Sequence, residues 1–219
     1  MKARVRRKFN IFEGIDGYHI DFYQNTFLDS PNGVIAIVTN RSDSRIHFPI
    51  VVDDEQMKEN GCSDCVYDGD HENILESAIF MESKFLKRLL SNKPLLCALW
   101  HEIGHFHTFR YFENQHDQNG SANKIRGEYI KRGEILPEEK AADLFALYYT
   151  SKEKMAIHFD LAIAEHLDDE GEVIPWHEMI VEELWLRKEY IENVGNSKED
   201  ILKELCKVCG VEYNPPEKR

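Results

Sequence analysis

The spacing of hydrophobic residues changes once along the chain. Within the first ~55 residues, short apolar runs at 34–38 and 48–52 are rich in β-branched side chains and are bounded by turn-forming or acidic residues, which is typical of strands. Weaker alternation at 9–12 and 18–22 adds two more candidate strands. We expect these segments to form a small antiparallel sheet.

From residue 72 onward, apolar residues recur at three- and four-residue intervals, as on one face of a helix. In the first predicted helix, the apolar face consists of Ile74, Ala78, Met81, Phe85, Leu86 and Leu89. Later helices are predicted from Pro94 to about residue 112, from Pro137, over 154–166, over 175–191 and from Ser197 toward residue 206. The polar stretch 113–136 is expected to be a loop that could contain a short helix.

These patterns predict an α+β fold in a single domain over residues 1–219. Residues 1–55 should be mainly β, with a small N-terminal antiparallel sheet, and residues 72–209 mainly α.

Composition narrows the choice of partners. Charged residues make up 31% of the 219 residues, and the formal net charge is −13. Because a phosphate backbone binds to a basic face, this acidic excess argues against nucleic acid as a direct partner. No apolar run reaches the ~20 residues that cross a bilayer, and no signal peptide is evident at the N-terminus. We therefore expect a cytoplasmic protein with no membrane partner.

The segment that carries chemistry is His101-Glu102-Ile103-Gly104-His105, inside the helix predicted after Pro94. Residues four apart lie on the same helix face, so both imidazoles can reach one ion. Glu102 is rotated by ~100° from His101, which suits a general base that reaches a water on the metal without binding the metal itself. At this composition a chance match occurs in about 1 in 20 such chains, so the motif alone is a hypothesis.

A third ligand is expected on the helix that begins at Pro137. Two histidines and one carboxylate are an accepted zinc ligand set, and we assign the carboxylate to Glu139, with Glu138 as the alternative. Asp143 lies four residues later on the same face, where it could accept a hydrogen bond from the free ring N–H of a ligating histidine. A purely structural role, in which Glu138 and Glu139 complement the helix dipole, is the competing interpretation.

Together, His101-Glu102-x-x-His105 and Glu139-x-x-Ala142-Asp143 resemble the gluzincin-like zincin metallopeptidases, and Glu139 lies 34 positions after His105. That short interval is most similar to the ImmA/IrrE type, and the resemblance covers roughly residues 90–150. It implies a zincin-like fold and a cytoplasmic zinc endopeptidase that cuts a protein or peptide substrate. The substrate of peptidases of this type is often a DNA-binding repressor.

The expected mechanism uses one catalytic zinc, with Glu102 as general base and a further donor for the oxyanion. Tyr148, Tyr149 and His116 are candidates for that donor, although each has an ordinary structural role as its simpler explanation. Two other functions remain open. One is a catalytically silent zinc site in a sensor or interaction protein, and the other is a coincidental motif in a helical interaction protein.

The remaining histidines and the cysteines give weaker evidence of a functional site. His107 is predicted to pack or to face solvent, and His158, His166 and His177 have no ligand partner at a useful spacing. Two Cys-x-x-Cys pairs match the spacing of a structural zinc site, at Cys62, Cys65, Cys206 and Cys209. Four unrelated reduced thiols are the alternative, because five cysteines in all do not form a closed disulfide set. Cys97 is expected in the core.

Overall fold

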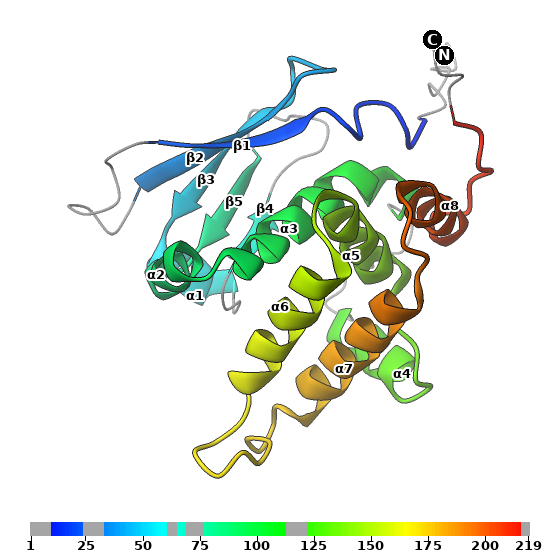
Figure 1. Cartoon of the computed structure of the whole chain (residues 1–219). Helices are drawn as coiled ribbons and strands as arrows, with labels where there is room; N and C mark the ends of the chain where they lie inside the picture. Colours follow the sequence, from blue (N-terminus) through cyan, green and yellow to red (C-terminus); the bar gives the residue numbers. More distant parts are fainter. Residues whose placement is uncertain (1–9, 24–32, 61–64, 69–76, 113–121, 216–219) are drawn as a thin grey trace, which may run out of the picture.

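The computed structural model describes residues 10–23, 33–60, 65–68, 77–112 and 122–215. Its strands come before nearly all of its helices, so the predicted α+β class is confirmed. In Figure 1 the sheet occupies one side of the molecule and helix α3 (Leu96–Thr108) runs beneath it, with the later helices beyond α3. Within the described ranges, no helix is both long enough and apolar enough to span a membrane.

The sheet has five strands in the order β1-β2-β3-β5-β4. The strands are β1 (Tyr18–Phe22), β2 (Gly33–Asn40), β3 (His47–Val52), β4 (Cys65–Asp68) and β5 (Ala78–Met81). The strands expected over 18–22, 34–38 and 48–52 are therefore present. Strands β3 and β5 run parallel, with Ile50 opposite Ile79, whereas the other pairs are antiparallel. The three strands expected from the sequence pair antiparallel, as predicted, whereas β5, which was not expected as a strand, lies parallel to β3 and makes the whole sheet mixed.

The β region extends beyond residue 55, because β4 and β5 lie within the stretch up to Met81. The helical spacing that included Ala78 and Met81 misled the prediction: residues 78–81 form β5, and the helix α2 (Ser83–Ser91) begins after it. A run of four apolar residues has no period of its own. Pairing with a neighbour on each side decides its conformation, and β5 lies between β3 and β4.

The other helices follow in chain order. They are α1 (Asp54–Asn60), α4 (Ala122–Ile130), α5 (Pro137–Tyr149), α6 (Lys152–Ala164), α7 (Glu178–Asn193) and α8 (Lys198–Val208), with 3-10 turns at Lys93–Leu95 and Phe109–Tyr111 on either side of α3. Helix α1 was not predicted. Its first turn is capped by Asp53, whose carboxylate accepts from the backbone N–H groups of Glu55 and Gln56.

Local signals set several helix ends. Pro137 occupies the first turn of α5, and Ser197 forms a capping box with Asp200 at the start of α8. Pro175 precedes α7 by three residues rather than opening it. The chain turns at Trp176, which has a φ of 78°.

Helices α3 and α5 pack closely against each other. Ala142 and Phe145 of α5 are fully buried, and Gly104 of α3 faces them. A Cβ atom at Gly104 would lie 2.8 Å from the Cα of Ala142 and 2.9 Å from its carbonyl oxygen. Because these are backbone atoms that cannot rotate away, only glycine permits this approach. The small residues at 104 and 142 therefore set the distance between the two helices.

We predict that Gly104→Ala lowers the free energy of unfolding by about 1–3 kcal/mol, because the added methyl must push α5 away from α3. Urea denaturation followed by circular dichroism would measure it. Gly127→Ala in α4 is the matched control, since its Cβ would meet only the Met179 Sδ at 3.4 Å and alanine is favoured in helices by up to ~1 kcal/mol. Equal stability of the Gly104 variant and wild type would contradict this account of the interface.

Candidate metal centre

Two histidines of α3 and one glutamate of α5 point toward a common position. The Nε2 atoms of His101 and His105 are 3.0 Å apart, and their rings are nearly perpendicular. Glu139 Oε2 is 3.3 Å from His101 Nε2, and Glu139 Oε1 is 3.8 Å from His105 Nε2. One ligand atom from each of the three lies within 4.8 Å of the others, and over the described ranges no other set of three His, Cys, Asp or Glu side chains does so. This group could hold a metal ion.

Both helices place their ligands for local reasons. His101 and His105 are one turn apart on the same face of α3, and between them Gly104 lets α5 come close. Glu139 sits in the first turn of α5, where the helix dipole favours a negative charge. Of the two glutamates considered from the sequence, the structure brings Glu139, not Glu138, into the group.

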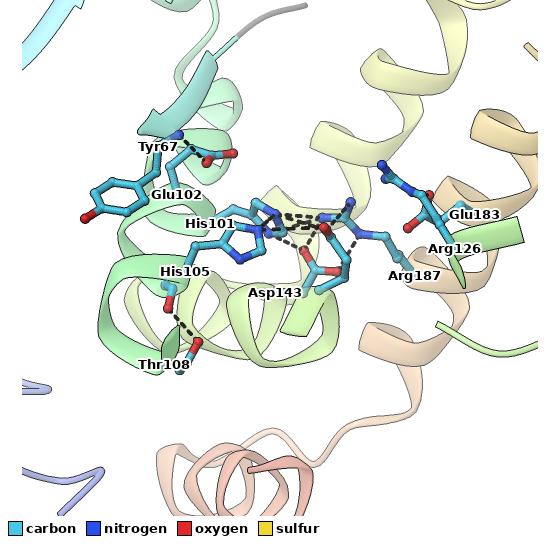
Figure 2. Close-up of polar contacts among 11 residues, drawn as sticks. Tyr67, His101, Glu102, His105, Thr108, Arg126, Asp143, Glu183 and Arg187 are labelled. Carbon is cyan, nitrogen blue, oxygen red and sulfur yellow. Dashed lines mark hydrogen bonds and ion pairs between the residues drawn. The ribbon is translucent and has the colours of Figure 1, made fainter. Parts of the chain in front are cut away.

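Asp143 lies one turn after Glu139 and is 1% exposed. Its Oδ1 is 2.8 Å from His101 Nδ1, which is the contact that the sequence predicts for it. Burial and Arg187 lower the pKa of His101, but Asp143 and Glu139 outweigh them and raise it to about 9. A metal at Nε2 would therefore displace a proton, and the hydrogen bond from Nδ1–H to Asp143 would hold the ring in the matching tautomer. Figure 2 shows Asp143 and His101 facing each other across the α3–α5 interface.

Glu102 is outside the ligand group and points toward the sheet. Its Oε2 accepts a hydrogen bond from the backbone N–H of Tyr67 in β4, at 2.7 Å (Figure 2). Burial raises the pKa of Glu102 to about 7, against the opposing effects of His101 and the Tyr67 N–H. A carboxylate with a pKa near neutrality is suited to exchanging protons at physiological pH.

The charged partners control the protonation of the ligands. Burial and the neighbouring His101 lower the pKa of His105 to about 4, so this ring is neutral and has a free lone pair. Burial disfavours ionised Glu139, but Arg187 and His101 outweigh it and hold the pKa of Glu139 well below its usual range. Glu139 is therefore ionised, as a metal ligand must be.

Sequence reasoning missed Arg187 of α7. Its guanidinium forms ion pairs with Asp143 at 2.6 Å and with Glu139 at 3.1 Å, and its side chain is only 9% exposed. One signal was available. Leu184, Arg187 and Ile191 follow the three- and four-residue spacing of the apolar face of α7, so an arginine there requires a buried anionic partner.

The ionisable groups around the site are closely paired. Glu183 pairs with Arg126, whereas Asp143 and Glu139 share Arg187 and His101. The pKa of His101 is raised to about 9, so this ring carries a positive charge at neutral pH. A metal ion bound between the ligands would displace a proton from His101 and supply the positive charge in its place.

The oxyanion candidates have other partners. The Tyr148 hydroxyl donates to Asp16, and the Tyr149 hydroxyl donates to the carbonyl of Ile15 while accepting from the N–H of Tyr18. These contacts tie α5 to the N-terminal segment, which is the structural role that the sequence left open for both tyrosines. His116 lies outside the described residues.

The remaining histidines are held in other contacts. His107 lies 3.1 Å from the Tyr18 hydroxyl and 2.9 Å from the carbonyl oxygen of Ile11, so it packs as expected. His166 and His177 contact each other at 3.3 Å. Neither they nor His158 belong to a group of three ligands among the described residues.

The cysteines do not form a shared site in the part of the chain that the structure describes. Cys65 is in β4, whereas Cys206 lies in α8 and Cys209 directly follows it, and no group of three ligands includes them. Cys62 lies outside the described residues, so the four-cysteine zinc site stays an untested prediction. Cys97 is fully buried in the core, as expected.

We predict that the wild-type protein binds one divalent metal ion per chain and that a double His101→Ala/His105→Ala variant binds none. Glu139→Gln should lose most of the metal, because a neutral amide replaces the charged ligand. Glu138→Gln is the matched control, one residue away, and should keep it. Elemental analysis after gel filtration would measure each ratio, and metal loss in the control but not in Glu139→Gln would reverse the assignment.

Comparison of the chain with models of protein families, with curated proteins and with solved structures gave no match. The geometry of the site shows a His-His-Glu group able to hold a metal ion, and the half-buried carboxylate of Glu102 follows directly after His101 on the same helix.

Proposed function

We propose that this protein is a zinc-dependent endopeptidase that hydrolyses a peptide bond in a protein partner. The observation that carries the proposal is the convergence of His101, His105 and Glu139, with Glu102 beside them but outside the ligand group. Two imidazoles and one carboxylate favour zinc among the available metals, and three protein ligands are typical of catalytic rather than structural zinc sites.

The resident zinc would activate a water molecule and polarise the scissile carbonyl. The chain supplies the proton transfers. Glu102 accepts a proton from the attacking water and then delivers it to the leaving amine, which ends the step with Glu102 ionised again. Its pKa of about 7 suits it to act as base and then as acid at neutral pH.

The substrate has a suitable surface beside the metal helix. Strand β4 lies at one edge of the sheet, and its Tyr67 N–H points away from β5 toward Glu102 of α3. Outward backbone groups on an edge strand can pair with an extended peptide. A peptide paired there would lie next to the general base, which favours an extended segment of a protein as the substrate.

The resemblance to ImmA/IrrE peptidases favours a regulatory protein, such as a repressor, as that partner. The acidic chain would attract basic segments of such a protein, because its formal net charge is −13.

One observation favours a different function, a catalytically silent zinc site in a sensor or interaction protein. The hydrogen bond from Tyr67 occupies Oε2 of Glu102 at 2.7 Å, so this oxygen can accept a proton from water only after it gives up that partner. In the silent alternative the bond persists and the site only stabilises a binding surface.

We predict that Glu102→Gln retains zinc but hydrolyses peptides about 10²–10⁴-fold more slowly, because the amide cannot accept the proton. The measurement is cleavage of a fluorescence-quenched random peptide library by the zinc-loaded protein, with Glu138→Gln as the control expected to match wild type.

Full activity in Glu102→Gln would overturn the assigned base. A wild-type protein that binds one zinc per chain and cleaves nothing in the library would favour the silent site.

A further inference from the structure

We propose that Arg187 is a positioning residue of the metal centre, which holds Asp143 and Glu139 in the orientation that metal binding requires. This inference rests on the proposed metal site and extends it to a third helix. Arg187 projects from α7, whereas the ligands come from α3 and α5. Figure 2 shows its side chain reaching across to Asp143 and His101.

The guanidinium binds Asp143 through two parallel hydrogen bonds. Arg187 Nε lies 2.7 Å from Asp143 Oδ2, and Nη2 lies 2.6 Å from Oδ1. This fork-to-carboxylate geometry fixes the rotation of the carboxylate as well as its position. The same Oδ1 faces His101 Nδ1 at 2.8 Å, so the orientation of the imidazole depends on the arginine through Asp143.

Arg187 also contacts Glu139, which is itself one of the proposed metal ligands. Arg187 Nη1 lies 3.1 Å from Glu139 Oε2. The two carboxylates of α5 are one helical turn apart, and each would repel the other in a poorly solvated site. One guanidinium between them offsets that repulsion and holds both carboxylates in place.

Arg187 is itself held in place by its surroundings. One turn earlier on α7, Glu183 is 2% exposed and pairs with Arg126 of α4. The Arg187 guanidinium also lies 5.6 Å from the ring centroid of Phe159 in α6. A side chain fixed on several sides loses little further freedom when the metal binds, which is the property expected of a preorganised outer ligand shell.

A positive charge close to a cation site could weaken metal binding by repulsion. The contacts argue against that outcome, because the guanidinium lies closest to carboxylate oxygens, 2.6 and 2.7 Å from Asp143 and 3.1 Å from Glu139, and 3.4 Å from His101 Nε2. Without the guanidinium, the two carboxylates would be free to rotate, which removes a properly oriented ligand.

The test is the zinc dissociation constant, measured by competition with a chromophoric chelator on the full chain. Arg187→Met should weaken zinc binding by about 10–100-fold, the usual effect of removing an outer-shell partner. Arg187→Lys keeps the charge but lacks the fork, and it should also bind zinc at least ~10-fold more weakly.

A separate control variant tests whether a general loss of stability would by itself weaken zinc binding. Ile191→Ala removes a side chain that is 1% exposed on the same helix, one turn from Arg187 and in the apolar core. It should destabilise the fold yet leave the zinc dissociation constant within about twofold of wild type, because no metal-site contact is lost. If Arg187→Met does not fold, the comparison of Arg187→Lys with Ile191→Ala provides the same test.

The outcomes separate this inference from the proposed function. Zinc affinity in Arg187→Met and Arg187→Lys equal to that of wild type would overturn the positioning role and leave the peptidase proposal intact. An equal loss of affinity in Ile191→Ala would also overturn it, since stability alone would then explain the effect. Failure of the wild type to bind zinc would overturn both proposals.

Discussion

The close contact between α3 and α5 is the constraint on which the site depends. The candidate metal ligands come from both helices, two from α3 and one from α5, so their separation is set by how near the two backbones lie. Gly104 and Ala142 determine that distance. Gly104, the residue just before the second histidine of the His-Glu-x-x-His segment, therefore has a packing role that the chemical motif does not reveal.

A row of alternating charges then connects this pair of helices to the rest of the helical region. It runs from Asp143 of α5 through Arg187 and Glu183 of α7 to Arg126 of α4. Buried networks of this kind are costly when any member is unpaired, because the local dielectric is low. They therefore favour one arrangement of the helices over others of similar apolar packing, and here the favoured arrangement is the one that completes the site.

Local patterns in the sequence anticipated the helical placement of the candidate site residues but not every strand of the sheet. His101, His105, Glu139 and Asp143 could be placed because one helical turn separates each pair, a local property that survives in the tertiary structure. The strand at residues 78–81 could not be predicted in this way, because a short apolar run takes its conformation from the strands beside it. Arg187 was missed because its partners lie more than 40 positions away in the chain, and no local pattern relates them.

The group of His101, His105 and Glu139 links the fold to its surroundings, because its members come together only in the folded chain. Unfolding separates Glu139 from the two histidines by a long segment of chain, so an ion held by all three binds the native state far better than the unfolded one. Such an ion adds about 2.7 kcal/mol of stability when its free concentration is one hundred times the dissociation constant. Cellular lifetime would then follow the supply of the ion, and scarcity would expose the chain to degradation.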